Sequence, residues 1–195
     1  MTMQGLSTSV LNAIYHRRSI RAYAAREVDE DTLQQLLKAA VQAPTARHAE
    51  PWAFVVIQDA ALLEHISDIT KAGLLRRAEG DANALGVFAA PEFNIFYDAG
   101  TLILICGRTQ TPFVAADCWL AAENLMLAAH AMDLGSCVIG SAVDALNGEL
   151  KEELGITADF TVHAPVIVGY PREEATTSPR KPPLLLKHIK AAGAA

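Results

Sequence analysis

The sequence predicts one domain, residues 1–195, that mixes α-helices with β-strands. Two patterns indicate this class: apolar residues at helical spacing, and short apolar or β-branched runs that lie between them. The chain has 195 residues, of which 51% are hydrophobic, so it is long enough to bury a core of its own. No internal repeat or domain boundary is visible.

Two helices are expected before residue 45. Ser7 is placed to cap a helix that runs to about Arg17, and Asp29 is placed to cap a second helix that ends at Pro44. The apolar stripes are Leu11, Ile14 and Tyr15 in the first helix, and Leu33, Leu36, Leu37 and Ala40 in the second. Such stripes are typical of helices that pack on one face.

Four runs of apolar, aromatic or β-branched residues predict β-strands. They are Trp52 to Ile57, Leu102 to Cys106, Ser136 to Ile139 and Val162 to Val168. Three more helices are expected between these strands. They are a helix from about Ala60, a helix from Val114 to Met132 that is apolar enough to be buried on all sides, and a short amphipathic helix from Asp144 to Leu154 capped by Asp144.

Two segments lack a regular pattern. Glu79 to Phe96 contains two glycines and Pro91, which predicts a mobile excursion with short helical pieces. After Pro171 the chain is too rich in proline for regular structure and ends in the apolar and basic segment Leu184 to Lys190. We expect this tail to wrap over another surface.

The net charge of −6 argues against general binding to nucleic acid or to anionic membranes, because both need basic surface. The mean hydropathy of +0.20 and the 19% of charged residues indicate that a partner subunit covers some apolar surface. Met1 to Val10 has no secretory pattern and the longest apolar run, Thr101 to Cys106, is too short to span a bilayer. We therefore expect a cytoplasmic homodimer with no membrane span.

The three cysteines, Cys106, Cys118 and Cys137, are odd in number and widely spaced. This spacing fits neither a disulfide framework nor a metal site, so we expect three buried thiols and no bound metal. A nucleophilic role for Cys137 is an alternative, but an apolar strand would raise the pKa of its thiol.

The most informative cluster is Arg17, Arg18, Ser19 and Arg21. Arginine side chains bind phosphate oxygens in a bidentate way, so the cluster is a candidate phosphate site. A solvated helix C-terminus, where cations favour the helix dipole, explains the same residues equally well. The sequence has no GxGxxG after a strand, no P-loop, no HExxH and no GxSxG, which argues against Rossmann, nucleotide-hydrolase, zinc and serine-nucleophile chemistry.

Several segments in order along the chain resemble the nitroreductase family of oxidoreductases that depend on flavin mononucleotide (FMN). They are Arg17 to Arg21 (RRSIR), Ala43 to Trp52, Ala121 to Ala129 (AAENLMLAA), Leu134 to Gly140 (LGSCVIG), and Val168 to Pro171 (VGYP) followed by Arg180. The resemblance implies an α+β fold with a central mixed β-sheet flanked by helices. It also implies an interlocked homodimer whose C-terminal tail wraps the partner, with FMN in the crevice between subunits.

By this resemblance, Arg17, Arg18 and Ser19 hold the FMN phosphate and ribityl chain, and Arg180 reaches the phosphate from the tail. Arg21 would face the pyrimidine edge of the ring, where a fixed positive charge stabilises the reduced flavin.

The backbone of Ile139 and Gly140 would donate a hydrogen bond to flavin N5, and glycine leaves the approach open. Val138 would pack against the ring, and Thr45 would come from the facing subunit. A plain core strand is the alternative for the side chains of Val138 and Ile139.

Two positions depart from the family pattern, in which a Ser–Asn–Gln set is frequent at Thr45, His48 and Glu50. His48 could donate a hydrogen bond to the flavin or substrate and could titrate near neutral pH. Glu50 either lowers the reduction potential of the flavin or points to solvent.

The resemblance implies hydride transfer from NADH or NADPH to the flavin and then to a flat electron-poor acceptor, such as a nitroaromatic or a quinone, by a ping-pong mechanism. No catalytic side chain is assigned, because the flavin does the chemistry and water can supply a proton. Two alternatives remain: a narrower task such as ene-reduction, dehalogenation or metabolite oxidation, and a flavin-storing dimer with little turnover.

Overall fold

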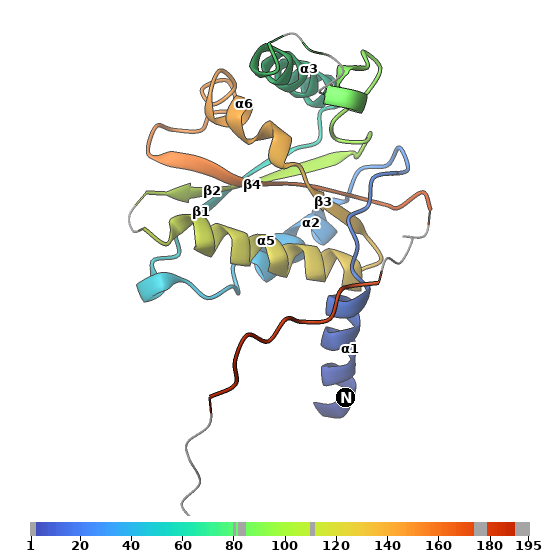
Figure 1. The fold of residues 1–195 in the computed structure, drawn as a ribbon, viewed down its shortest axis with the longest axis vertical. Coiled ribbons are helices and arrows are strands. Elements are labelled where there is room, and N and C mark those ends of the chain that lie inside the picture. Colours follow the sequence, from blue (N-terminus) through green and yellow to red (C-terminus); the bar gives the residue numbers. More distant parts are fainter. Residues whose placement is uncertain (1–2, 80, 82–84, 110–111, 174–178, 190–195) are drawn as a thin grey trace, which may run out of the picture.

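The structure is a computed structural model that describes residues 3–79, 81, 85–109, 112–173 and 179–189, with side chains described from residue 10 onward. The chain forms three layers, in which helices cover both faces of a central β-sheet (Figure 1). The predicted mixture of helices and strands is confirmed.

The sheet has four strands in the order β1-β2-β4-β3. Their bounds are Trp52–Ile57 for β1, Thr101–Arg108 for β2, Gly135–Val138 for β3 and Phe160–Gly169 for β4. All three pairs of neighbouring strands are antiparallel. The parallel pairing expected of a mixed sheet occurs, in the described residues, only as an isolated bridge between Ser19 and Ser136.

The pairing of the central strands, β2 and β4, contains an irregularity, and a side chain forms hydrogen bonds with the backbone there. The register shifts between Ile105, which pairs with Ala164, and Cys106, which pairs with Val162. The Asn147 side chain donates to the carbonyl of Val162 at 2.9 Å and accepts from its N–H at 2.8 Å. Asn147 therefore satisfies both backbone groups of Val162 beside the irregularity.

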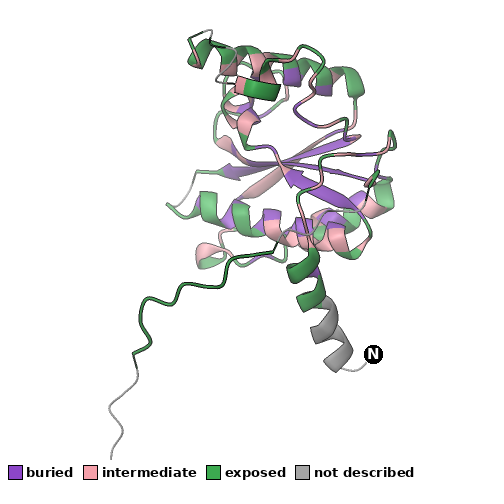
Figure 2. Cartoon of the chain, turned by 45° about the vertical axis from the view of Figure 1, so that its right-hand side comes forward, coloured by how far each residue is buried: buried purple, intermediate pink, exposed green. Residues whose placement is uncertain are grey.

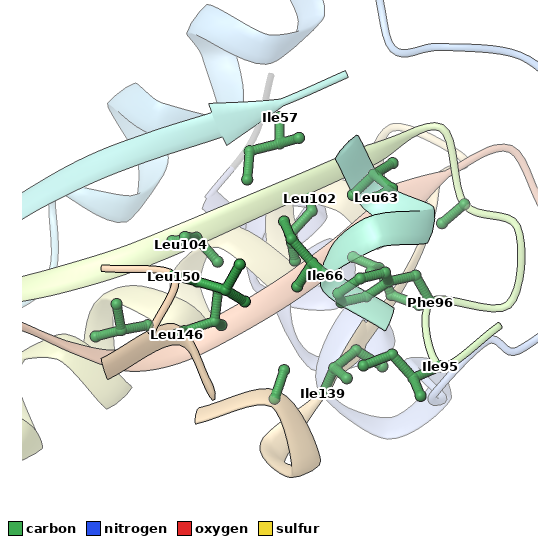
Figure 3. Packing of buried hydrophobic residues seen from close by; sticks show 14 of the residues in the cluster. Ile57, Leu63, Ile66, Ile95, Phe96, Leu102, Leu104, Ile139, Leu146 and Leu150 are labelled. Carbon is green, nitrogen blue, oxygen red and sulfur yellow. The ribbon is translucent and has the colours of Figure 1, made fainter. Parts of the chain in front are cut away.

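One face of the sheet is covered by α3 (Ala60–Arg77) and α6 (Val143–Asn147). Their apolar side chains meet the sheet in a buried cluster that includes Ile57, Leu63, Ile66, Ile95, Phe96, Leu102, Leu104, Ile139, Leu146 and Leu150 (Figure 3). Helix α3 is capped by Asp59, which accepts from the N–H of Leu62 at 3.0 Å.

The helix predicted over residues 144–154 is much shorter in the structure. Helix α6 ends at Asn147, and Ala142 rather than Asp144 occupies its cap position. Asp144 lies in the first turn of α6 and forms an ion pair with Arg77 of α3. The helix stops because the Asn147 side chain binds strand β4 and the backbone leaves the helical region at Gly148.

The other face of the sheet is covered by α2 (Glu30–Ala40) and α5 (Val114–Ala131). Asp29 caps α2 as predicted and accepts from the N–H of Thr32 at 2.9 Å. The expectation that the long helix is buried on all sides is wrong within one protomer. Only one face of α5 packs on the sheet, and Trp119 and Leu120 on the other face are 43% and 45% exposed (Figure 2).

Helix α1 (Met3–His16) projects from the body of the molecule (Figure 1). It begins before Ser7, so Ser7 lies inside the helix and is not its cap. The apolar side chains of Val10, Leu11, Ile14 and Tyr15 are all exposed. This helix buries almost none of its described apolar surface within one protomer.

The predicted excursion contains the expected short helical piece, η2 (Gly86–Ala89). The rings of Phe88, Phe93 and Tyr97 then pack edge to face, with centroid separations of 5.4 Å in each pair. Residues 80 and 82–84 of the excursion lie outside the described residues.

The tail, residues 179–189, has no helix or strand and runs beneath the body (Figure 1). Its apolar side chains, Leu184, Leu185, Leu186 and Ile189, are exposed. That the tail wraps a partner subunit stays a prediction.

The three cysteines are free and buried, as expected. Burial raises the pKa of the Cys106 thiol to about 11 and that of Cys118 to about 12. In the described part of the chain, no helix combines the length and apolar character that a bilayer span requires.

Replacing Asn147 by Ala should destabilise the fold by roughly 2–4 kcal/mol, because the N–H and C=O of Val162 would both lose their partner in a buried position. Urea unfolding of the purified protein measures this loss. Asn147→Asp, which keeps the acceptor and removes the donor, should lose about half as much. Equal stability of Asn147→Ala and the wild type would contradict the assignment.

Candidate functional site

The predicted phosphate-binding residues lie in a short segment, residues 17–21, that leaves α1 and runs along β3 (Figure 1). The N–H of Ile20 donates to the carbonyl of Ser136 at 3.1 Å. A Cβ atom on Gly135 would lie 2.8 Å from the Ile20 side chain, so glycine permits this close approach. The 17–21 segment is thus fixed against the edge strand of the sheet.

The two arginines that end α1 have different surroundings. Arg18 donates to the carbonyls of Tyr15 and Arg17, both at 2.8 Å, as expected for a cation at a helix C-terminus. Its Nε atom is buried and has no partner. Arg17 lies 3.6 Å from the carboxylate of Glu123 on α5. Each arginine therefore still has hydrogen-bonding capacity for a ligand.

A hollow of about 580 Å³ opens beside these arginines. Its basic and hydroxyl lining residues are His16, Arg17, Arg18, His130, Ser136 and Arg172, and two carboxylates, Asp133 and Glu173, also line it. The hydroxyl of Ser136 is buried in the lining without a partner. Desolvation, followed by the nearby His16 and Arg17, lowers the pKa of His130.

This hollow fits a phosphate-bearing ligand. It gathers several cations, and it contains two buried polar atoms, Arg18 Nε and Ser136 Oγ, that lack partners. Buried groups of this kind are normally hydrogen-bonded, and an anion is a suitable acceptor for both. Ser136, His130 and Arg172 were not predicted as site residues, because only the fold brings them to the 17–21 segment. His16 directly precedes Arg17 in the sequence and was not predicted either.

Arg21 adjoins a second, smaller hollow of about 320 Å³. Its guanidinium lies 5.9 Å from the centre of the Tyr97 ring, and Phe93 and Arg172 also line the hollow. Tyr97 and the following Asp98 both have positive φ, 54° and 59°. Such backbone strain in consecutive residues is frequent near functional sites.

The end of β3 presents an open backbone. The side chain of Ile139 is buried in the core cluster, and its N–H donates to the carbonyl of Pro165 at 2.9 Å (Figure 3). That side chain thus matches the plain core-strand alternative, whereas Val138 is only half-buried. A Cβ atom on Gly140 would meet no atom within 4 Å. A flat ligand therefore has room to approach the backbone at Gly140.

Thr45 and His48 lie in a turn formed by residues 45–50, which includes η1 (Ala46–His48). Arg47, His48 and Glu50 have φ of 58°, 53° and 42°. A positive φ at a residue other than glycine lowers the stability of the fold by about 1 kcal/mol or more. The side chains of His48 and Glu50 are exposed.

The 45–50 turn is far from the arginines of the same protomer. Ala46 contacts Asp117 near the start of α5, whereas His130 in the last turn of α5 lines the cationic hollow. These positions are thirteen residues apart, which corresponds to about 20 Å of helix. Figure 1 shows the turn and the end of α1 at opposite ends of α5. One protomer therefore does not bring Thr45 and His48 to the 17–21 segment.

Arg180 is exposed in the tail. It follows residues 174–178, which lie outside the described residues, and its predicted contact with phosphate is untested. Within the described part of the chain, no group of three or more His, Cys, Asp or Glu residues is arranged to hold a metal.

Solved structures share this fold. An FMN-bound nitroreductase from Bacteroides fragilis superposes with a TM-score of 0.79 at 25% identity, covering 92% of this chain and 97% of that chain. An iodotyrosine deiodinase bound to FMN and 3-iodo-L-tyrosine has a TM-score of 0.74, covering 92% of this chain and 99% of that chain. At 21% identity the second match shows the fold alone.

Comparison with related sequences is more specific than the shared fold. A protein from Archaeoglobus fulgidus, provisionally named an NADH dehydrogenase/NAD(P)H nitroreductase, is 33% identical over 167 residues, which cover 84% of this chain and 86% of the relative. The model of the Nitroreductase family matches residues 14–170, which include the 17–21 segment, the 45–50 turn and the end of β3. The chain therefore belongs to the nitroreductase family.

Proposed function

We propose that this protein is an FMN-dependent oxidoreductase that takes hydride from NADH or NADPH and passes it to a small electron-poor acceptor. The observation that carries the proposal is the cationic hollow beside residues 17–21, where Arg18 Nε and Ser136 Oγ are buried without partners. A flavin phosphate would supply acceptors for both. The matching family and the FMN-bound relative of similar fold support the same cofactor.

The 17–21 segment binds and orients the cofactor in this proposal. Arg17, Arg18 and Ser19 bind the phosphate and ribityl chain, and Arg180 adds a cation from the tail. Arg21 places a fixed positive charge at the pyrimidine edge of the ring, where it stabilises the negative charge of the reduced form. Tyr97 lies beside Arg21 and limits the space at that edge.

The end of β3 positions the reacting edge of the ring. The N–H of Gly140 donates toward N5, and the open space in front of Gly140 admits the flat ring. FMN, when bound, supplies the chemistry by accepting a hydride at N5 and returning it. Val138 packs against the ring, and no side chain of this chain needs to act as an acid or base.

The donor and the acceptor use the same exposed face in turn, which makes the kinetics ping-pong. The reason is that the sequence has no GxGxxG motif for a separate dinucleotide site. A nitroaromatic or a quinone is flat enough to occupy that face. The protein acts in the cytoplasm, where its three free thiols stay reduced.

The active form is a homodimer. A subunit interface would bury the exposed apolar side chains on α1, α5 and the tail. These side chains include Leu11, Ile14, Trp119, Leu120 and Leu185. The separation of the 45–50 turn from the 17–21 segment supports the same conclusion. Thr45 and His48 of one subunit would complete the site that the arginines of the other subunit begin.

The second candidate function is a reaction on a narrower class of acceptors. The rings of Phe93 and Tyr97 beside Arg21 form an aromatic-lined hollow, which favours aromatic acceptors. Reductive dehalogenation or ene-reduction of such a compound would use the same flavin. A storage dimer with little turnover would bind FMN and oxidise NADH and NADPH slowly or not at all.

The absorbance spectrum of the purified protein tests the cofactor and the donor together. We expect flavin bands that anaerobic NADH or NADPH bleaches and that a nitroaromatic or quinone then restores. Flavin bands that neither nicotinamide bleaches would favour storage. A colourless protein that does not bind added FMN would overturn the proposal.

Arg17→Ala should weaken FMN binding, because it removes a charge-assisted phosphate contact worth about 1.5–3 kcal/mol, and so raise Kd roughly 10- to 150-fold. Fluorescence titration of the apoprotein with FMN measures this change. Arg76→Ala is the control, because Arg76 is an exposed arginine paired with Glu149, which follows the end of α6. An unchanged Kd in Arg17→Ala would refute the phosphate assignment.

Leu120→Glu should convert the dimer into monomers and abolish tight FMN binding, because it places a charge on the exposed apolar face of α5. Sedimentation velocity measures the assembly. Leu75→Glu changes an equally apolar exposed position on α3 and should leave the dimer intact. A wild-type protein that sediments as a monomer while binding FMN tightly would exclude a shared site.

A further inference from the structure

The 45–50 turn holds an unfavourable backbone without a glycine. Three of its residues, Arg47, His48 and Glu50, have positive φ, which is uncommon for residues other than glycine. The proposed function places Thr45 and His48 at the flavin of the facing subunit. Contacts from outside the turn must therefore hold its backbone in this conformation.

The turn does not cap its own helical segment. Thr45 occupies the cap position of η1, but its side chain makes no capping hydrogen bond. Its hydroxyl instead accepts from the N–H of Glu50 at 3.4 Å, across the turn. The N–H of Ala46 is left without a partner inside the turn.

Asp117 on α5 supplies the missing acceptor. Its Oδ1 and Oδ2 atoms lie 3.2 and 3.4 Å from the N–H nitrogen of Ala46, which is 71 residues away in the sequence. Asp117 is only 3% exposed, although Ala116 and Trp119 on the same helix are exposed. Within the described residues, no ion pair joins Asp117 to a cation.

Burying a carboxylate in an apolar layer is unfavourable unless the group performs a task there. Asp117 lies among the residues that pack α5 on the sheet, with Val114 and Cys118 buried on either side of it. A hydrogen bond to an ionised acceptor is stronger than one between neutral groups. The carboxylate is thus well suited to tie a strained turn to a rigid helix.

We infer that Asp117 is a positioning residue of the flavin site. It touches neither cofactor nor substrate, and it acts by fixing the N–H of Ala46, so that the 45–50 turn presents Thr45 and His48 toward the facing subunit. The inference rests on the proposed function. It assigns a role to a residue that lies outside every segment predicted to touch the flavin.

The test compares Asp117→Ala with Asn124→Ala in the full-length protein. Asn124 is a matched control on the same helix, because its side chain also makes one hydrogen bond to a distant backbone group, the carbonyl of Ala39 at 3.3 Å. We expect Asp117→Ala to raise the Kd for FMN at least tenfold and to change the visible circular dichroism of the bound flavin. Asn124→Ala should leave Kd within twofold and the dichroism unchanged.

Two more variants separate positioning from a general loss of packing. Asp117→Asn keeps an acceptor for Ala46 and should restore the wild-type dichroism and most of the affinity. Ala46→Pro removes the donor and leaves Asp117 in place, and proline is accepted at the first position of a helical segment. It should reproduce the effect of Asp117→Ala, and the double variant should be no worse than either single one.

The outcomes distinguish this inference from the proposed function. A wild-type protein that binds no FMN would overturn both. Tight FMN binding by the wild type, with Kd and dichroism unchanged in Asp117→Ala and Ala46→Pro, would overturn the inference alone. Equal losses in Asp117→Ala and Asn124→Ala would also overturn it, because they would indicate a structural role without positioning. If Asp117→Ala does not fold, the Kd for FMN and the dichroism of Ala46→Pro and Asp117→Asn test the inference in its place.

Discussion

The pairing of β2 with β4 is the interaction on which the rest of the structure depends. Both strands are central, and every residue of β2 except Arg108 is buried. A strand buried on both faces requires an apolar layer above and below it. The two helical layers follow from this requirement, and the candidate site lies at the end of β3, which is an edge strand.

The site is assembled from parts that are rigid for different reasons. Hydrogen bonds to β3 fix the 17–21 segment, and the core fixes Ile139. The 45–50 turn is held to α5 by the hydrogen bond from the N–H of Ala46 to Asp117. Strained residues occur in this turn and at Tyr97, next to Arg21. The other described non-glycine residues with positive φ, Glu79 and Asp133, follow the ends of α3 and α5. Away from these helix ends, the strained residues lie in segments that the proposed function places around the flavin.

Charge is distributed unevenly in this acidic protein. Arginines and histidines meet at the junction of α1, β3 and the end of β4, where desolvation and neighbouring positive charges disfavour the protonated form of histidine. The lowered pKa of His130 is a sign of that cost. An anionic ligand would offset the repulsion between these cations, so the electrostatics of the hollow favour its binding.

The sequence by itself determined the elements and the family. Four strands, the α2 cap at Asp29 and the arginine cluster follow from patterns within a few residues of one another, where spacing and side-chain chemistry act directly. The helix predicted from Asp144 to Leu154 is too long, because the side chain of Asn147 binds β4 and α6 ends there, which no local pattern records. The long helix seemed fully buried because composition does not say which face meets the sheet. Only the tertiary structure brought Asp117 to Ala46 and Ser136 to the arginines, since such contacts join residues that are distant in the chain and depend on how the layers pack.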